Sequence, residues 1–382
     1  MNLKRYFNLE GDRTIWAITF LLMLSSILVV YSATGALAYK QAGGNTWYYF
    51  FRHSIFLIFG FLFSYIVHIV PSRYFSRLGQ IAFYISILLL VHTLIAGLNI
   101  NNASRWISIG GQSLQTSDIA KLSLIMFLSR KIIKSKYKLN DLKFISKHLF
   151  LPLTIICALI FPANFSTSAL VMITSLCLFF LAGVHIKHLI LYTFCIIFCS
   201  SVLILIAIQT PYLNEIVPRA NTWVNRVQNY TKDKQQNTDD FYQVTQAKIA
   251  LVNGGIYGRG PGKSIQRNTL PHPYSDYIYA IIIEEYGLIG GIFVLLLYMI
   301  LLLRGRLIFN NSNNSFGGFL AIGLTISLVL QALVNMAVAV DFFPVTGQTL
   351  PLVSMGGTSI IFTCITIGII LSVSRDLKIN IN

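Results

Sequence analysis

The chain has 382 residues, of which 55% are hydrophobic and 11% are charged, and its formal net charge is +16. Soluble domains carry about 25% charged residues, so this composition excludes an ordinary soluble protein. Repeated apolar runs of roughly 20 residues indicate a helical membrane protein with several spans. The positive charge requires no nucleic acid, because basic loops that face anionic lipid account for it.

Ten apolar segments are predicted as transmembrane helices. They cover residues 14–34, 52–70, 77–97, 115–132, 149–162, 167–183, 187–209, 277–303, 316–340 and 349–374, and the fifth and sixth are short. With the N-terminus inside, 17 of the 29 basic residues fall in cytoplasmic segments and three in short outer loops. This asymmetry follows the positive-inside rule and predicts an all-α protein with both termini in the cytoplasm.

The polar stretch 101–121 lies outside in this topology and leads into the fourth span. Thr116 or Ser117 is predicted to cap that helix, with Asp118 in its first turn. Asp118 and Lys121 are three residues apart, so they share a helix face and are expected to pair. The pair is either structural, or it directs Lys121 into a polar cavity that meets an anionic substrate.

Residues 210–276 are predicted to form one large extracytoplasmic loop between helices 7 and 8. A helix at the membrane interface is predicted over 241–252. The run Gly258-Arg-Gly-Pro-Gly-Lys-Ser264 follows, but it lacks the Walker spacing and no strand precedes it. We expect a tight turn that exposes backbone N–H groups near Arg259, Lys263 and Arg267, which could hold a lipid-linked phosphate.

Asp276 lies where this loop re-enters an apolar segment, and Glu284 and Glu285 follow within ten positions. The chain has only 13 acidic residues, and ionisable groups at a membrane boundary are costly and usually functional. For Asp276 the structural alternative is an N-cap of the eighth helix. For the two glutamates it is a hydrogen-bonding role, with at least one of them facing the bundle interior.

The segment Asp341–Ser359 contains Pro344, Gly347 and Pro351 among apolar residues. This composition is typical of a broken or re-entrant segment that lines a cavity. No group of His, Cys, Asp and Glu residues in the sequence has the spacing of metal ligands.

Three groups of motifs resemble a known family. They are Arg105-Trp-Ile-Ser-Ile-Gly110 with Gln115-Thr-Ser-Asp-Ile-Ala-Lys121, Leu270-Pro-His-Pro-Tyr-Ser-Asp-Tyr-Ile-Tyr-Ala280 with Glu284-Glu285-Tyr-Gly287, and Pro344-Val-Thr-Gly-Gln-Thr-Leu-Pro-Leu-Val-Ser-Met-Gly-Gly357. Together they resemble the SEDS family of shape, elongation, division and sporulation proteins, the FtsW and RodA group. The likeness covers nearly the whole chain, and Thr349-Leu-Pro-Leu-Val-Ser354 looks closer to FtsW.

The resemblance implies a single ten-helix domain over residues 1–382 in the bacterial inner membrane. It implies a peptidoglycan glycosyltransferase that polymerises lipid II into glycan strands at the outer face of the membrane during cell division. The implied partners are lipid II, the polyprenyl-pyrophosphate-linked glycan, a class B penicillin-binding transpeptidase and other division or elongation proteins. The family's essential aspartate falls on Asp276.

The sequence departs from the usual family motifs at four places. Gln115-Thr-Ser-Asp118 replaces Gln-Pro-Ser-Glu, Pro271-His-Pro-Tyr-Ser-Asp276 replaces Pro-Glu-x-His-Thr-Asp, Ala163-Asn-Phe-Ser-Thr167 replaces Pro-Asp-x-Gly-Thr, and Ser354-Met-Gly-Gly357 replaces Ser-Tyr-Gly-Gly. Roles of the missing family glutamate and histidine are therefore not carried over. Asp276 and Lys121 are present, so the chemistry implied by the family is retained.

Asp276 is predicted to be the general base that takes a proton from the attacking sugar hydroxyl. Charge on the departing pyrophosphate needs cations. The predicted substrate-binding residues are Lys121, Arg105, Arg259, Lys263, Asp118, Glu284, Glu285 and Ser354. No protein-bound metal site is predicted, although a divalent cation, Mg²⁺ or Mn²⁺, would serve the same charge.

Two other classes of function compete with this hypothesis. A flippase for a lipid-linked precursor would suit broken helices, but it predicts charges in several spans. A non-catalytic scaffold of the division or elongation complex predicts that Asp276 is dispensable. The ionisable residues gather near the predicted outer face, which favours an outward-facing enzyme.

Overall fold

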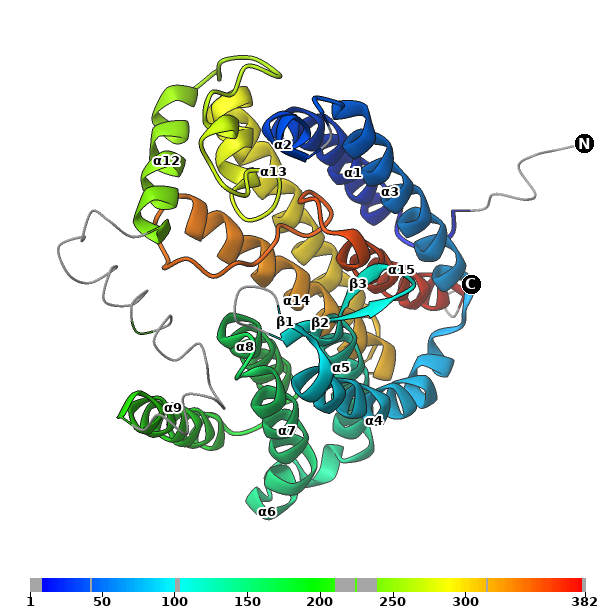
Figure 1. The fold of residues 1–382 in the computed structure, drawn as a ribbon. Coiled ribbons are helices and arrows are strands. Elements are labelled where there is room, and N and C mark those ends of the chain that lie inside the picture. The colour runs from blue at the N-terminus through cyan, green and yellow to red at the C-terminus, as the bar shows by residue number, and fades with distance from the viewer. Residues whose placement is uncertain are drawn as a thin grey trace, which may run out of the picture. The chain divides into compact units, whose positions relative to one another are not determined.

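The computed structural model describes residues 9–41, 43–99, 104–209, 224, 239–313 and 315–379. Figure 1 shows the main elements along the chain, most of which are helices. The helices are α1 (Arg13–Ala33), α2 (Gly35–Gln41), α3 (Thr46–Ile69), α4 (Ser72–Ala96), α5 (Thr116–Lys134), α6 (Leu142–Ile145), α7 (Leu151–Ile160), α8 (Phe165–Leu181), α9 (Ile186–Gln209), α12 (Asp239–Gly254), α13 (Ile278–Asn311), α14 (Phe316–Ala339) and α15 (Gly357–Ile379). The strands are β1 (Leu98–Asn99), β2 (Ser104–Ile109) and β3 (Gln112–Gln115).

The predicted spans coincide in chain order with α1, α3, α4, α5, α7, α8, α9, α13, α14 and α15. Within the described residues, eight helical segments are long and apolar enough to cross a membrane. Of the other two helices, α8 has only 17 residues and α5 carries charged residues near both ends. The chain is therefore a multi-pass, all-α membrane protein, as its sequence predicts.

Several predicted boundaries differ from the helix ends: α3 begins at Thr46 rather than 52, and α13 ends at Asn311 rather than 303. Two further differences affect the ends of non-helical segments. The sequence predicts a short fifth span over 149–162, whereas α6, a π-helical turn and α7 together run from Leu142 to Ile160. It predicts that the tenth span begins at residue 349, whereas α15 begins at Gly357. Pro351 has no N–H to donate, and Leu352 has a left-handed φ of 64°, so this stretch does not form a helix.

The described residues form two compact units. Unit 1 comprises Met1–Ser72, Lys234–Ser312 and Leu328–Asn382, and unit 2 comprises Arg73–Asp233 and Asn313–Ser327. The residues of α14 are thus divided between the two units. The single domain predicted over residues 1–382 stays a prediction.

In unit 1, α3 packs along α15 through small residues. A Cβ added to Gly60 would lie 2.7 Å from Cys364 Sγ, and one added to Gly368 would lie 2.7 Å from the Ser64 carbonyl oxygen. Small residues let membrane helices approach closely enough for their backbones to pack. Substitution at either glycine would therefore separate the two helices.

In unit 2, α5 is largely buried and packs against its neighbours in the same way. Gly79 of α4 lies against Met126, and Gly323 lies against Ile125. Arg130 Nη1 donates a hydrogen bond of 2.7 Å to the Ser76 carbonyl oxygen. Close packing and this bond fix α4 against α5.

The polar stretch before α5 forms a three-stranded antiparallel sheet in the order β1-β2-β3, which the sequence analysis did not predict. β2 and β3 pair from Trp106 with Gln115 to Ile109 with Gln112. The two residues between them, Gly110 and Gly111, both have positive φ, 57° and 78°, as a two-residue hairpin turn requires.

The start of α5 also differs from the prediction. The N-cap residue is Gln115, so neither Thr116 nor Ser117 caps the helix. The Gln115 side chain makes no capping bond, and its Nε2 donates to Ser117 Oγ at 2.9 Å. Strand β3 runs directly into α5 and sets the first helical residue at Thr116. Asp118 does lie in the first turn, as predicted.

Two predicted features of the outer loop fall on described residues. Helix α12 confirms the helix predicted over 241–252, and it packs on α13 in unit 1. The glycine-rich run and the Asp276 motif follow as a series of turns up to α13. Residues 210–223 and 225–238 of the loop lie outside the described residues.

The segment 340–356 between α14 and α15 is not helical, which confirms the broken segment predicted there. Side chains of unit 1 donate hydrogen bonds to its carbonyl oxygens: Gln331 Nε2 to Thr349 at 3.0 Å, the Tyr298 hydroxyl to Pro351, and Ser26 Oγ to Val353 at 2.8 Å. Non-helical backbone within a membrane domain is tolerated where the protein itself satisfies its polar groups. These bonds meet that requirement.

Candidate functional site

Asp276 lies half-buried in the turn that precedes α13. Its Oδ1 accepts a hydrogen bond of 2.9 Å from Ser275 Oγ. The N-cap residue of α13 is Tyr277, and its side chain makes no capping bond. The alternative in which Asp276 is the N-cap of this helix is therefore wrong, and its carboxylate lies at the junction of the helix and the loop that precedes it.

Tyr274 and Gly347 lie beside the Asp276 carboxylate. Burial, followed by the charges of Tyr49 and Asp276, raises the pKa of the Tyr274 phenol. Tyr274 therefore keeps its proton and stays neutral next to the carboxylate. A Cβ added to Gly347 would lie 3.7 Å from Asp276 Oδ2, so the chain passes this oxygen without a side chain.

Ser354 lies under the Asp276 turn and is only 2% exposed. Its hydroxyl donates a hydrogen bond of 2.7 Å to the Ser275 carbonyl oxygen and accepts one of 2.8 Å from the Leu350 N–H. The hydroxyl proton is thus already committed within the protein. Its predicted contact with substrate stays a prediction.

Glu284 is fully buried, with 0% exposure, and its carboxylate is held by the glycine-rich turn. It accepts hydrogen bonds from the Ser264 hydroxyl, from the Ile265 N–H at 3.1 Å and from the Gln266 N–H at 3.2 Å. Backbone N–H groups that converge in this way form an anion-binding nest. The anion in this nest is the chain's own glutamate.

Glu285 is 1% exposed and reaches a second set of donors. Its Oε1 accepts a hydrogen bond from the Ser32 hydroxyl of α1 and one of 3.4 Å from the Ser264 N–H. Arg267 Nη1 donates to Ser32 Oγ at 3.0 Å, and its charge also acts on Glu285. Buried charges need partners of this kind, because an unpaired one would be strongly destabilising.

These contacts correct the expectation that the glycine-rich turn exposes its backbone N–H groups. The N–H groups of Ser264, Ile265 and Gln266 point to the glutamates, and those of Arg259 and Gly260 donate to the Glu284 and Glu285 carbonyl oxygens, each at 2.9 Å. The turn is an anion site that is already filled. The contacts favour the structural role left open for the two glutamates, both of which face the interior, and their contact with substrate stays a prediction.

Backbone carbonyl groups just before the glycine-rich turn accept hydrogen bonds from α13 where this helix is interrupted. Gly287 has φ 71° and ψ −173°, which interrupts the helix. The Leu288 and Ile289 N–H groups donate to Gly255 and Ile256 carbonyl oxygens at 2.9 and 3.4 Å instead of to the preceding helical turn. A Cβ at Gly287 would collide with the Ile256 carbonyl oxygen, so this position requires glycine.

Arg259 and Lys263 are exposed on the outer surface of this turn. With the backbone N–H groups committed inward, these two side chains are what the turn presents to an anionic ligand. Arg267, four residues after Lys263, is partly buried and bound to Ser32.

Three predicted binding residues lie in unit 2. Lys121 Nζ is 3.8 Å from Asp118 Oδ1, which confirms the predicted pair, and the side chains are 18% and 10% exposed. Arg105 Nε donates a hydrogen bond of 2.7 Å to the Ala163 carbonyl oxygen, and its guanidinium lies 6.0 Å from the Trp106 ring centre. Both cations are thus held by partners of their own unit.

A small cavity in unit 2 is lined by Arg105 together with other polar and apolar residues. Its lining includes Thr116, Ser117 and Asn164, and its volume is about 20 Å³. A cavity of this size has room for about one water molecule. As formed in this structure it is too small for a sugar or a pyrophosphate.

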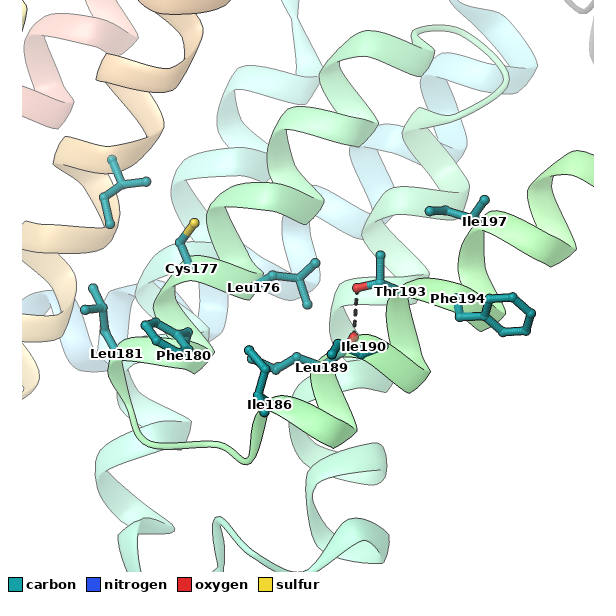
Figure 2. Close-up of a pocket in the computed structure, with 11 residues that line it drawn as sticks. Leu176, Cys177, Phe180, Leu181, Ile186, Leu189, Ile190, Thr193, Phe194 and Ile197 are labelled. Carbon is teal, nitrogen blue, oxygen red and sulfur yellow. Dashed lines mark hydrogen bonds between the residues drawn. The ribbon is translucent and has the colours of Figure 1, made fainter.

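A larger, open apolar pocket of about 680 Å³ is lined mainly by α8 and α9 in unit 2. Figure 2 shows its lining, which includes Leu176, Phe180, Leu189 and Phe194. The Thr193 hydroxyl donates at 2.8 Å to the Leu189 carbonyl oxygen, drawn as the dashed line. The lining thus offers hydrocarbon contacts, as expected beside membrane lipid.

In the described part of the chain, no three His, Cys, Asp or Glu residues are grouped as metal ligands.

Comparison with known proteins decides the family. The family model for cell cycle proteins of the FtsW, RodA and SpoVE type matches residues 12–379. The chain belongs to this FtsW/RodA/SpoVE family. The resemblance inferred from the motifs is confirmed, and the match extends over both units.

Full-length relatives carry FtsW names. A probable peptidoglycan glycosyltransferase FtsW from Coxiella burnetii is 32% identical over 98% of this chain and 99% of the relative. Another from Wigglesworthia glossinidia brevipalpis is 31% identical over 94% of this chain and 93% of the relative. Within the FtsW/RodA/SpoVE family, this chain is therefore similar to the FtsW members, as predicted.

Two solved structures share the fold of the family. A chain from a peptidoglycan synthase complex that coordinates polymerization and crosslinking gives a TM-score of 0.73 at 22% identity, over 96% of this chain and 98% of that one. RodA of Thermus thermophilus gives 0.64 at 21% identity, over 96% of this chain and 97% of RodA. These likenesses confirm the polytopic helical fold.

Unit 1 brings together Asp276, Ser354, Glu284, Glu285, Arg259 and Lys263, whereas Lys121, Asp118 and Arg105 belong to unit 2. Sequence analysis missed Tyr274, Ser32 and Asn335, which contact the site in unit 1. Asn335 could have been recognised from the sequence as a candidate, because a polar group inside an apolar membrane span usually has a defined partner. Tyr274 and Ser32 carry no comparable signal.

Proposed function

We propose that this chain is a peptidoglycan glycosyltransferase that polymerises lipid II into glycan strands at the outer face of the bacterial inner membrane during cell division. Its membership of the FtsW/RodA/SpoVE family supports this, as do the relatives named peptidoglycan glycosyltransferase FtsW. The observation that carries the proposal is the position of Asp276, a half-buried carboxylate at the junction of outer loop and α13.

In the proposed reaction, the hydroxyl oxygen of the incoming sugar attacks the anomeric carbon of the growing glycan. A glycosidic bond forms between these two atoms, and the bond from the anomeric carbon to the pyrophosphate oxygen breaks. Asp276 takes the hydroxyl proton, since a carboxylate within hydrogen-bond reach can act as general base. Direct displacement would invert the configuration at the anomeric carbon.

Negative charge on the leaving polyprenyl pyrophosphate must be stabilised. Arg259 and Lys263 suit this role, because they are exposed on the same outer segment of unit 1 as Asp276. The substrate contacts of Lys121, Asp118 and Arg105 predicted from the sequence are part of the proposal, and Mg²⁺ or Mn²⁺ would add to the same positive charge.

We propose a class B penicillin-binding transpeptidase as the partner of this chain. The solved complex that coordinates polymerization and crosslinking contains a chain of the same fold, which supports this choice. The proposed orientation has both termini in the cytoplasm, because the basic residues of the short loops then lie inside.

The test is polymerisation of purified lipid II by the wild type and by Asp276→Asn, each in complex with the penicillin-binding partner. We expect glycan strands from the wild type and a loss of about 10²–10⁴-fold in rate from the variant, which is the usual contribution of a general base. Thermal unfolding in detergent checks that the variant is folded.

Equal polymerisation by both proteins would overturn Asp276 as the base while keeping the enzyme. Absence of polymer from both would favour the flippase or the scaffold. Transport of a labelled lipid-linked precursor across vesicles then separates these two.

A further inference from the structure

The turn that carries Asp276 is held by hydrogen bonds to three consecutive backbone carbonyl groups. The Tyr274 carbonyl oxygen accepts a hydrogen bond of 2.9 Å from the Met355 N–H. The Ser275 carbonyl oxygen accepts one of 2.7 Å from Ser354 Oγ, and the Asp276 carbonyl oxygen accepts one of 2.9 Å from Asn335 Nδ2. The donors lie 59 to 81 residues farther along the chain, so tertiary contacts fix this turn.

Asn335 on α14 joins two backbone segments with one amide group. Its Nδ2 donates to the Asp276 carbonyl oxygen at 2.9 Å and to the Gln348 carbonyl oxygen at 2.7 Å. A side-chain amide has two N–H donors, so both are used. Asn335 is 1% exposed, which shields these bonds from competing water. The amide therefore sets the distance between Asp276 and the segment that contains Gly347.

That distance matters because the Gly347 backbone passes beside the carboxylate. A Cβ added to Gly347 would lie 3.7 Å from Asp276 Oδ2. Gly347 has φ 65°, a conformation that glycine adopts without strain. Release of the Gln348 carbonyl would let this backbone shift against the carboxylate. Asn335 thus fixes the position of the Gly347 backbone beside the Asp276 carboxylate.

Ser354 supports the preceding residue in the same way. Its hydroxyl donates to the Ser275 carbonyl oxygen and accepts from the Leu350 N–H, and the side chain is 2% exposed. The Ser354 hydroxyl thus links two backbone groups, the Leu350 N–H and the Ser275 carbonyl. Ser354 therefore acts on the Asp276 turn from beneath.

We propose that Asn335 and Ser354 are positioning residues, which orient the Asp276 carboxylate towards the attacking hydroxyl. For Ser354 this role takes the place of the substrate contact predicted from the sequence. This inference rests on the proposed function. A general base must lie within hydrogen-bond reach of its proton, and a misplacement of about 1 Å can cost 10²-fold in rate. Loss of either side chain should therefore reduce kcat rather than substrate affinity.

The test compares Asn335→Leu and Ser354→Ala with Gln331→Leu, all in complex with the penicillin-binding partner. Gln331 is the matched control, because its amide on the same helix also donates to a backbone carbonyl oxygen of the segment 340–356, that of Thr349 at 3.0 Å. The measurements are kcat and KM for lipid II, together with thermal unfolding in detergent.

For Asn335→Leu we expect kcat to fall about 10- to 100-fold with KM unchanged, as loss of an interaction that matters in the transition state predicts. For Ser354→Ala we expect a fall of about tenfold, and for Gln331→Leu a kcat within about threefold of the wild type. Ser354→Ala carries the test if Asn335→Leu does not fold.

Unchanged kcat in folded Asn335→Leu, or in Ser354→Ala where only that variant folds, would overturn the inference. An equal loss of kcat in Gln331→Leu would also overturn it, because the effect would then belong to the whole segment 348–353. Asp276→Asn in the same assay separates failure of the inference from failure of the proposed function. Wild-type rates in Asp276→Asn would remove both.

Discussion

The glycine-rich turn and the Asp276 turn lie on either side of residue 270, and they treat carboxylates in opposite ways. In the glycine-rich turn, backbone N–H groups and the Ser264 hydroxyl converge on the buried Glu284. In the Asp276 turn, the protein binds the backbone carbonyl groups and leaves the carboxylate half-buried. A saturated carboxylate is suited to hold structure, and an accessible one is suited to exchange protons.

Asp276→Asn and Glu284→Leu should separate the two regions most strongly. The first should lower kcat by about 10²–10⁴-fold without lowering the unfolding temperature. The second removes the acceptor of three donors, two of them buried. At about 1–3 kcal/mol for each unsatisfied group it should destabilise the protein by several kcal/mol. Lipid II polymerisation and thermal unfolding in detergent measure the two effects. The contrast fails if Glu284→Leu is as stable as the wild type.

Gly287→Ala should disturb the glycine-rich turn and its contact with α13. The backbone conformation at φ 71° and ψ −173° alone should cost about 1–3 kcal/mol with a side chain present, and the collision with the Ile256 carbonyl oxygen adds to this. Gly262→Ala is the matched control, since Gly262 also has a positive φ, 74°, but open space around its Cβ position. Unfolding temperatures should fall clearly more for Gly287→Ala, and equal falls would mean that strain rather than the contact dominates.

Lys263→Ala should affect binding and leave the fold intact, because Lys263 is exposed. We expect KM for lipid II to rise about three- to tenfold, and raised salt should diminish the difference from the wild type. Lys187→Ala serves as the control, because Lys187 is exposed in the first turn of α9, on the side predicted to be cytoplasmic, and it should leave KM unchanged. A larger loss of kcat than of affinity would argue against a role in ground-state binding.

Lys248→Ala should have the smallest effect. Lys248 of α12 forms an ion pair with Asp341, and their side chains are 45% and 15% exposed. Exposed pairs contribute about 0–1 kcal/mol, so the unfolding temperature should change little. A fall as large as that of Glu284→Leu would show that surface charge, rather than the buried nest, holds the outer loop in place.

The sequence by itself determined the features that depend on local patterns. Apolar runs set the positions of the spans, the spacing of Asp118 and Lys121 set their pairing, and the pattern over 241–252 predicted α12. Hydropathy and helical periodicity are properties of neighbouring residues, so one chain suffices to read them. The two glycines at 110 and 111 could also have predicted the hairpin of β2 and β3, because such pairs favour two-residue turns.

Only the tertiary structure decided which carboxylate is buried and which is accessible. The partners of Glu284 and Glu285 come from Ser264 and Ser32, 20 and 253 residues away, and the support of Asp276 comes from Asn335, 59 residues away. Tertiary structure also decided that α15 begins at Gly357. Hydropathy alone assigns the residues from 349 to the span, but side chains from other helices donate hydrogen bonds to their carbonyl oxygens, so they need not be helical. A carboxylate's environment is set by groups that folding brings together, and no local pattern records them.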